Sequence, residues 1–417
     1  MRAFLETVRL ELRRFVRAKA AAMLLVASLA WMVAMPALVK SDGTAQGARE
    51  IYLHYSLGGV FALCCVTLSA SAAASLARER EERRLALSVV RPQARATLAL
   101  GRIVALTLAG SVVLAAAALA AGAVTGFSRS CAHVLSPVLP SPRAEAEEMY
   151  RHYMADPETP PEVKKAKKSL VMRILTQRAV DNYQSIAPGE TAQWLFAPHP
   201  GWREDYRVRM RFTNDFDIRD DVRGAFVFGG FSGAVSNITQ AVATIPLARD
   251  GEAPVTGVLA FRNDGEHALM LRPRRDINLL VRADAFGWNL LRAYAQLVSM
   301  LAALLAFATF LGSGLGRAVA VFTCLAVLFV SAVSDDVIAQ YPDPLESDRT
   351  DRIGLAITRA VSSASQSVAS LSPLSALSQD ACVETRETLF ALLRNLVGLP
   401  LLFALLSGLA IAKKPSA

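Results

Sequence analysis

The chain has 417 residues, of which 53% are hydrophobic and only 19% are charged. A soluble protein of this length carries more charge, so the apolar excess predicts segments that lie in lipid. The formal net charge of +9 does not indicate a nucleic-acid-binding protein, because most basic residues flank apolar segments and form no patch with interleaved aromatic side chains. We therefore expect a membrane protein that contacts lipid and binds no nucleic acid.

The apolar runs predict about six transmembrane helices, since a helix of about 20 residues crosses the hydrocarbon core. The runs are Ala20–Val39, Tyr55–Ala77, Ile103–Phe127, Ala293–Gly316, Ala318–Ser334 and Leu389–Ala412. The fifth is short, and the sixth contains Arg394, which is near enough to one end to reach the headgroups. The predicted fold class is a polytopic all-α membrane domain interrupted by one large insert.

The basic residues predict the orientation of these spans, because loops rich in Lys and Arg stay in the cytoplasm. Met1–Lys19 and Arg78–Arg102 are strongly basic, and Arg317 and the C-terminal lysine pair continue the pattern. The alternate loop 335–388 is mainly acidic. We expect a bacterial inner (plasma) membrane protein with both termini in the cytoplasm.

The N-terminus has the pattern of an amphipathic helix over residues 3–18, with apolar side chains at helical spacing and arginines on the other face. Such a helix is expected in the cytoplasmic membrane interface, with its arginines on anionic headgroups. A basic lead into the first span is the simpler alternative. A cleaved signal peptide is disfavoured because the first apolar run exceeds the usual length.

Residues 128–288 form the predicted extracytoplasmic insert, which separates a first membrane segment, 1–127, from a second, 289–417. Its first part, 128–188, is predicted to be helical, with an apolar stripe at Val163, Ala166, Leu170 and Ile174 opposite a lysine-rich side. Its second part, 190–284, has the alternation of short strands and predicts a small antiparallel β-sandwich. The expected strands are Tyr206–Phe212, Gly224–Gly230, Thr239–Leu247, Pro254–Asn263 and Ile277–Ala283.

No motif indicates an enzyme. The chain has no G-x-x-x-x-G-K-[ST] phosphate loop, no paired histidines with metal-ligand spacing and no glycine-flanked serine nucleophile. The glycines of Gly312–Gly316 are explained by a tight turn between two spans. We expect no metal site and no bound cofactor.

Two of the five cysteines, Cys131 and Cys382, lie on the expected outer side, each a few residues from a membrane boundary. An oxidising compartment permits a disulfide between them, which would tie the insert to the last external loop, although proximity cannot be read from the sequence. Cys64, Cys65 and Cys324 lie within spans and are expected to be packing residues.

The segment 78–102 is predicted to form a helical elbow in the cytoplasm. It continues the second span as a highly charged helix and breaks at Arg91-Pro92, because proline disfavours helical backbone in the preceding residue. A new helix then enters the membrane after Gly101-Arg102. An elbow with one charged and one leucine- and valine-rich side is suited to docking in a groove of a cytoplasmic partner.

This segment resembles the coupling region of the type-2 ATP-binding-cassette exporter permeases. That family shows a charged R-E-R-E run, a leucine-rich turn, R-P, a basic residue three positions later and G-[KR] at the start of the next span. The matching residues here are Arg78-Glu-Arg-Glu81, Leu85, Leu87, Arg91-Pro92, Arg95 and Gly101-Arg102. The interfacial helix and the number of spans also match, whereas Arg84-Leu-Ala86 replaces the usual T-L-E and the large insert is not a general family feature.

The resemblance implies the membrane subunit of an exporter, which binds a separate cytoplasmic ATP-binding subunit and pairs with a second permease, identical or different. ATP is then bound and hydrolysed only by the partner. Since no ionisable residue lies deep in a span, the cargo is expected to be hydrophobic or amphipathic, unless the task is mechanical work in the envelope. The residues implied in coupling are Glu81, Glu82, Arg84, Leu87, Arg91, Pro92, Arg95, Gly101 and Arg102.

The alternative is a membrane-anchored binding or assembly scaffold. In that case the β-sandwich recognises a polysaccharide, a peptide or a partner protein, and the spans only anchor it. Trp194, Trp202 and Trp288 are the first candidates for contact, although tryptophan in a sandwich core is usually buried.

Overall fold

The computed structural model describes residues 2–39, 45–82, 95–127, 129–157, 159, 164, 166–197, 206–213, 221–239, 242–249, 257–340 and 373–413. The chain divides into two compact units. The helical unit comprises Met1–Cys131 and Ala285–Ala417, and the inserted unit comprises Ala132–Asp284. The prediction of long apolar helices with a separate inserted β-domain is confirmed.

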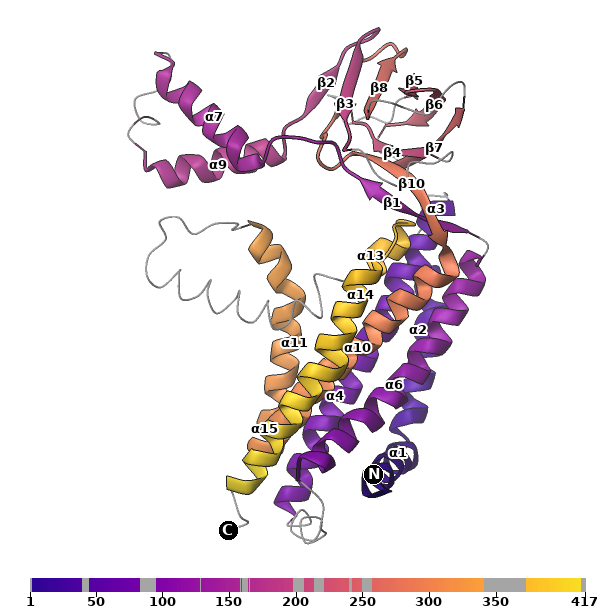
Figure 1. Cartoon of the computed structure of the whole chain (residues 1–417), viewed down its shortest axis with the longest axis vertical. Helices are drawn as coiled ribbons and strands as arrows, with labels where there is room; N and C mark the ends of the chain where they lie inside the picture. Colours follow the sequence, from indigo (N-terminus) through magenta and orange to yellow (C-terminus); the bar gives the residue numbers. More distant parts are fainter. Residues whose placement is uncertain are drawn as a thin grey trace. The chain divides into compact units, whose positions relative to one another are not determined.

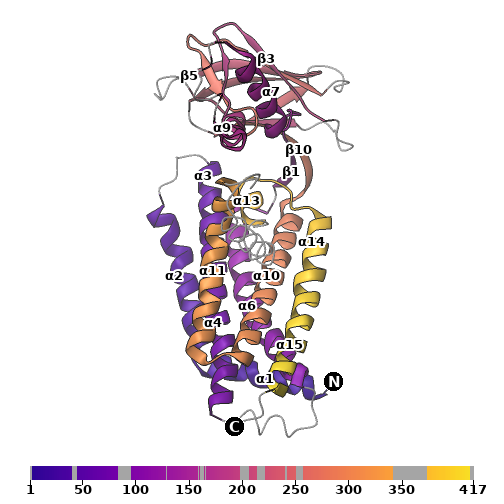
Figure 2. The ribbon, with the colours of Figure 1, turned by 90° about the vertical axis from the view of Figure 1, so that its left-hand side faces the viewer.

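The helical unit is a bundle whose long helices run side by side (Figures 1 and 2). Each long helix coincides with an apolar run of the sequence. Such helices are apolar on all sides, as expected for helices that lie in a membrane or in the core of a bundle. Its elements in chain order are α1 (Arg2–Arg17), α2 (Ala20–Leu38), α3 (Ala45–Glu50), the π-helix η1 (Ile51–Ser56), α4 (Leu57–Glu81), α6 (Arg95–Thr125), α10 (Phe286–Gly314), α11 (Arg317–Gln340), α13 (Pro373–Ser378), α14 (Thr385–Ala391), the π-helix η2 (Leu392–Gly398) and α15 (Leu399–Lys413).

Five helical segments of the described chain are long and apolar enough to cross a membrane: Ala20–Leu38, Gly47–Glu81, Arg95–Thr125, Phe286–Gly314 and Thr385–Ile411. The predicted fifth span corresponds to α11, in which the apolar part among the described residues, Arg317–Phe329, is shorter. Two helices extend beyond the predicted runs through charged residues, α4 at its end to Glu81 and α6 at its start from Arg95.

The centre of the bundle is α10, which packs against α4, α6 and α15. Leu297, Leu301, Leu305 and Ala308 of α10 are buried there at helical spacing. By contrast, α2 and the Thr385–Ile411 segment keep most of their apolar side chains exposed, as helices facing lipid do.

The inserted unit is built on one curled eight-stranded sheet with the strand order β1-β10-β4-β7-β6-β5-β8-β3. A two-stranded sheet, β2-β9, accompanies it. The strands are β1 (Ser130–Leu135), β2 (Gln184–Ile186), β3 (Thr191–Leu195), β4 (Tyr206–Arg211), β5 (Asp221–Phe228), β6 (Phe231–Ile238), β7 (Val242–Arg249), β8 (Val258–Asn263), β9 (Leu269–Leu271) and β10 (Ile277–Ala285).

A single curled sheet replaces the two facing sheets of the predicted sandwich. The curl is centred on β7, whose first six residues pair with β4 and whose last two pair with β6, both antiparallel. The two edges of the sheet also meet, through an antiparallel bridge between Pro137 and Phe196 directly after β1 and β3. This single bridge brings the two edges of the sheet together at one point.

The core of the inserted unit lies inside the curl. The alternation predicted for β4 is confirmed, with Tyr206, Val208 and Met210 buried on the inner face. The Tyr206 ring lies edge-on to those of Phe228 and Phe231, 5.3 and 4.7 Å between centroids. These contacts join strands that are not neighbours in the sheet, so the aromatic core holds the curl closed.

The helical part of the insert consists of α7 (Pro142–Ala155) and α9 (Lys168–Val180), which pack on each other. The predicted apolar stripe is wrong at Leu170 and Ile174, which are 47% and 58% exposed, whereas Ala166 packs against the buried residues of the α7–α9 pair and Val163 lies outside the described residues. The buried stripe is Val171, Leu175 and Ala179, which has the same spacing but is rotated by one residue, about 100°, around the helix. Because α9 carries apolar residues along both lines, the periodicity alone did not determine which line packs against α7.

Candidate functional site

One end of the bundle carries a set of ion pairs and is called here the charged end. It consists of α1, the last turn of α4, the first turns of α6 and the turn between α10 and α11. The charged run Arg78–Glu82 forms the end of α4 and lies at the centre of the charged end. All five of its residues contact a partner, either on another segment or on α4 itself, so the run organises the charged end.

The most buried charge is Arg102 on α6, which is 6% exposed. Its guanidinium forms an ion pair with Glu79 of α4 and another with Glu11 of α1, at 3.2 Å from Nε to Oε1. Arg14 of α1 contacts the same two carboxylates, at 2.5 Å from Glu79 and 3.2 Å from Glu11. This network joins α1, α4 and α6.

Helix α1 also packs tightly on the start of α6. A Cβ atom added at Gly101 would lie 2.8 Å from Cγ2 of Thr7, so any other residue there would require the Thr7 side chain to move. Val8 and Phe15 of α1 are buried, while Leu5 and Val16 are 55% and 64% exposed. The predicted amphipathic helix is present. Part of its apolar face packs against the other helices of the bundle, and the rest stays exposed.

The next two residues of the run, Arg80 and Glu81, contact the turn between α10 and α11. Arg80 donates hydrogen bonds to the carbonyl oxygens of Ser313 and Leu315, at 2.9 and 2.5 Å. The backbone amide of Arg317 donates to Oε1 of Glu81 at 3.0 Å. Arg78 and Glu82, by contrast, pair with each other along α4, at 2.6 Å.

The structure therefore gives several predicted coupling residues partners within the chain. Glu81 accepts from α11, Glu82 pairs with Arg78, and Gly101 and Arg102 hold α1 against α6. Arg95 is half-buried at the first position of α6. The remaining predicted positions, Arg84, Leu87, Arg91 and Pro92, lie outside the described residues.

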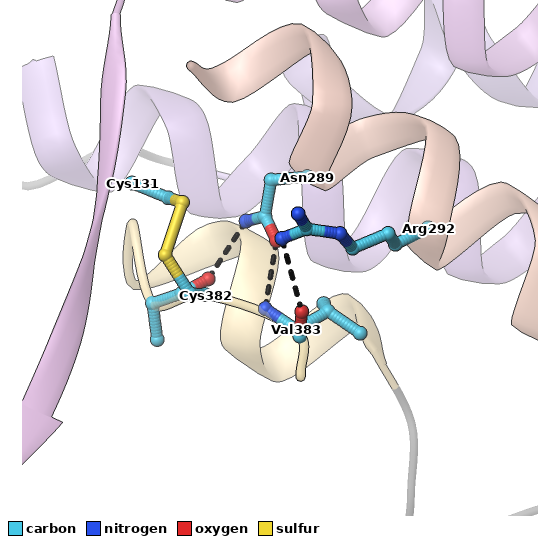
Figure 3. Close-up of a disulfide and its surroundings, with 6 residues drawn as sticks. Cys131, Asn289, Arg292, Cys382 and Val383 are labelled. Carbon is cyan, nitrogen blue, oxygen red and sulfur yellow. Dashed lines mark hydrogen bonds between the residues drawn. A yellow bond between two sulfur atoms is a disulfide. The ribbon is translucent and has the colours of Figure 1, made fainter. Parts of the chain in front are cut away.

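The opposite end of the bundle holds a disulfide and is called the disulfide end. Cys131 and Cys382 are joined there, 251 residues apart in the sequence. Figure 3 shows Asn289 of α10 beside this bond: its Nδ2 donates to the Ala381 carbonyl at 2.8 Å, and its Oδ1 accepts from the Val383 amide at 2.7 Å. Asn289 is fully buried, so the segment around Cys382 is fixed to α10.

Gln296 lies two turns after Asn289 on α10 and makes a similar polar contact. Its Nε2 donates to Oγ1 of Thr388 on α14 at 3.0 Å, and both residues are buried. Near the same end, Arg49 pairs with Asp380 at 3.4 Å. Asn289 and Gln296 were missed by the sequence reasoning, although an amide inside an otherwise apolar helix is a recognisable signal of interhelical bonding.

The inserted unit contains no comparable centre among its described residues. Trp194 is buried and donates to Gln184 at 2.9 Å, which makes it a core residue, and Trp202 lies outside the described residues. Trp288, which belongs to the helical unit, is 63% exposed. Of the three tryptophans named as candidate contacts, only Trp288 is thus shown to be accessible.

A group of charges joins the α7–α9 pair to the sheet. Arg274 contacts Glu145 of α7 at 2.9 Å, and Arg275 contacts Asp181 after α9 at 3.5 Å. Beside them, a hydrogen bond to Asp276 raises the pKa of Arg272 above its usual value. These pairs stabilise the joint between the α7–α9 pair and the sheet. Within the described part of the chain, no group of three or more His, Cys, Asp and Glu residues could hold a metal ion.

Comparison of the chain with protein-family models, with curated proteins and with solved structures finds no match.

Proposed function

We propose that the chain is the membrane-spanning permease subunit of an ATP-binding-cassette exporter. It passes movement from a separate cytoplasmic ATPase to an unidentified hydrophobic or amphipathic substrate, or to work in the envelope. The proposed orientation places the charged end in the cytoplasm, because the strongly basic segments of the sequence lie there. It places the inserted unit outside the cytoplasm.

The observation that supports this proposal best is the position of the charged run. Arg78–Glu82 closes α4 and begins the segment 78–102, which resembles the family's coupling region. Through Glu79 the run bonds to α1 and α6, and through Arg80 and Glu81 it bonds to α10 and α11. A partner that moves this segment therefore acts on five helices at once, as a permease driven from the cytoplasm requires.

Co-purification tests the proposal. The chain is extracted from native membranes in mild detergent and assayed for a bound ATP-binding-cassette ATPase, first for any whose gene lies beside its own. Wild type is compared with Arg91→Glu plus Arg95→Glu, which reverses two charges of the predicted elbow. The matched control is Lys413→Glu plus Lys414→Glu, which makes the same charge change on the same proposed side.

We expect the wild type and the control to retain the ATPase and the elbow variant to lose it. Loss in the control as well would show that the charge change alone is responsible. If the wild type binds no ATPase, the exporter proposal fails. The second candidate, a membrane-anchored scaffold, would then be favoured, because the inserted unit has a core of its own and can present a binding surface independently of the helices.

A further inference from the structure

The turn between α10 and α11 leaves backbone groups without helical partners. The last carbonyls of α10 and the first amides of α11 have no hydrogen-bond partner within their own helices. The turn itself is only Leu315 and Gly316. Since α10 ends and α11 begins within two residues, an accepting and a donating set of backbone groups lie next to each other.

The end of α4 satisfies both sets with charges of the appropriate sign. The Arg80 guanidinium contacts the Ser313 and Leu315 carbonyls, where the α10 dipole is negative. The Glu81 carboxylate accepts from the Arg317 amide, where the α11 dipole is positive. Charge-assisted hydrogen bonds of this kind are stronger and more directional than neutral ones. Two adjacent residues thus hold a turn that is more than 230 residues away in the sequence.

Near these bonds, α10 also packs closely against the backbone of α4. A Cβ atom added at Gly312 of α10 would lie 2.4 Å from the carbonyl oxygen of Ala73 on α4. The two helices are therefore in close backbone contact at Ala73, about two turns before Arg80 on α4. A helix pair packed this closely and bonded at its end responds to a force as one body.

We propose that Arg80 and Glu81 form a clamp that makes the last turn of α4 and the α10–α11 turn move together. The inference rests on the proposed exporter function and deepens it, since the clamp is the route by which movement of the end of α4 reaches the buried helix α10. Arg80 and Glu81 are positioning residues: they act on the helices and do not contact the ATPase. Glu81, expected at the docking surface, has an internal role instead.

Arg78 provides a matched control. It has the same side chain two residues earlier on the same helix, is exposed, and pairs with Glu82 on α4. Arg78→Gln and Arg80→Gln therefore remove the same charge from the same helix end, and only the second removes contacts to the α10–α11 turn. Glu81→Ala removes the other half of the clamp.

The first experiment uses the full chain alone in detergent and measures amide hydrogen exchange in the segment 313–320. We expect Arg80→Gln and Glu81→Ala to exchange faster there than the wild type, and Arg78→Gln to exchange at the wild-type rate. Unchanged exchange in both clamp variants overturns the clamp. Exchange that rises over the whole bundle also overturns it, because the residues would then stabilise the fold in general.

The second experiment adds the ATPase and ATP. We expect the clamp variants to co-purify with the ATPase as well as the wild type does and to lose the change in ATP hydrolysis that the wild type imposes on it. Loss of co-purification would show that Arg80 and Glu81 are docking residues and would overturn the inference. If no ATPase binds even to the wild type, the exporter proposal fails separately, and the exchange experiment alone decides whether the clamp exists.

Discussion

Arg102 is the residue on which the joint of α1, α4 and α6 depends. It is the most buried member of its network, and it separates the carboxylates of Glu11 and Glu79, whose side chains are 12% and 15% exposed. Without it, two largely buried carboxylates face each other with only Arg14 beside them. Removing one partner from a buried ion pair is costly because the remaining charge is left without solvent or a counter-ion.

We expect Arg102→Met to lower the stability of the helical unit by about 3 kcal/mol. The control is Arg14→Met, which removes a charge that contacts the same two carboxylates but is 56% exposed, and should cost less than about 1 kcal/mol. Thermal unfolding in detergent, followed by intrinsic fluorescence, distinguishes the two. Equal losses for both variants would mean that Arg102 is better hydrated than its position implies.

The partners of single charges could not be predicted from the sequence. In Arg78–Glu82 the signs nearly alternate, so Glu79, Glu81 and Glu82 are equivalent as a pattern. The structure gives each a different partner: Arg102 for Glu79, the α11 amide for Glu81 and Arg78 for Glu82. That choice depends on the rotation of α4 and on a turn far along the chain, which local periodicity does not encode.

At the scale of elements, the close contact of α4 and α10 depends on one glycine. Gly312→Ala places a methyl group against the backbone of Ala73, and backbone atoms cannot move aside as a flexible side chain can. We expect a loss of about 1–3 kcal/mol from this overpacking. Gly314→Ala is the control, since a Cβ atom there would meet nothing within 4 Å.

Both glycine variants can be compared by the fraction of protein that remains monodisperse in detergent after heating. A Gly312→Ala protein as stable as Gly314→Ala would show that α4 and α10 can separate without cost. Such a result would also weaken the clamp, because its two helices would then be free to move apart.

The elements themselves were largely predictable, and their contacts were not. Long apolar runs determine helices in lipid because the backbone must satisfy its own hydrogen bonds there. Strict alternation likewise predicted β4. The apolar face of α9 and the curl of the sheet depend instead on which surfaces meet in three dimensions. The bridge from Pro137 to Phe196, for example, joins two segments whose contact no sequence pattern predicts.

At the scale of the whole molecule, the disulfide connects the two halves of the helical unit. Cys131 is the last residue of the first half of this unit, and Cys382 lies in the second half, before the last helices. A protease site placed in the segment 251–256 of the insert would cut the chain between these cysteines. We expect the two fragments to migrate together on a denaturing gel without reductant and to separate once reductant is added.

Cys131→Ser supplies the control for this experiment, because its fragments should separate without reductant. The same variant should also be less stable, by about 2–5 kcal/mol, since the bond closes a very long loop in the unfolded chain. Asn289 still holds the segment around Cys382 by two hydrogen bonds, so the variant should fold and remain testable. Fragments of the wild type that separate without reductant would show that the two sulfurs are not bonded, and the disulfide end would then depend on polar contacts such as those of Asn289 and Gln296.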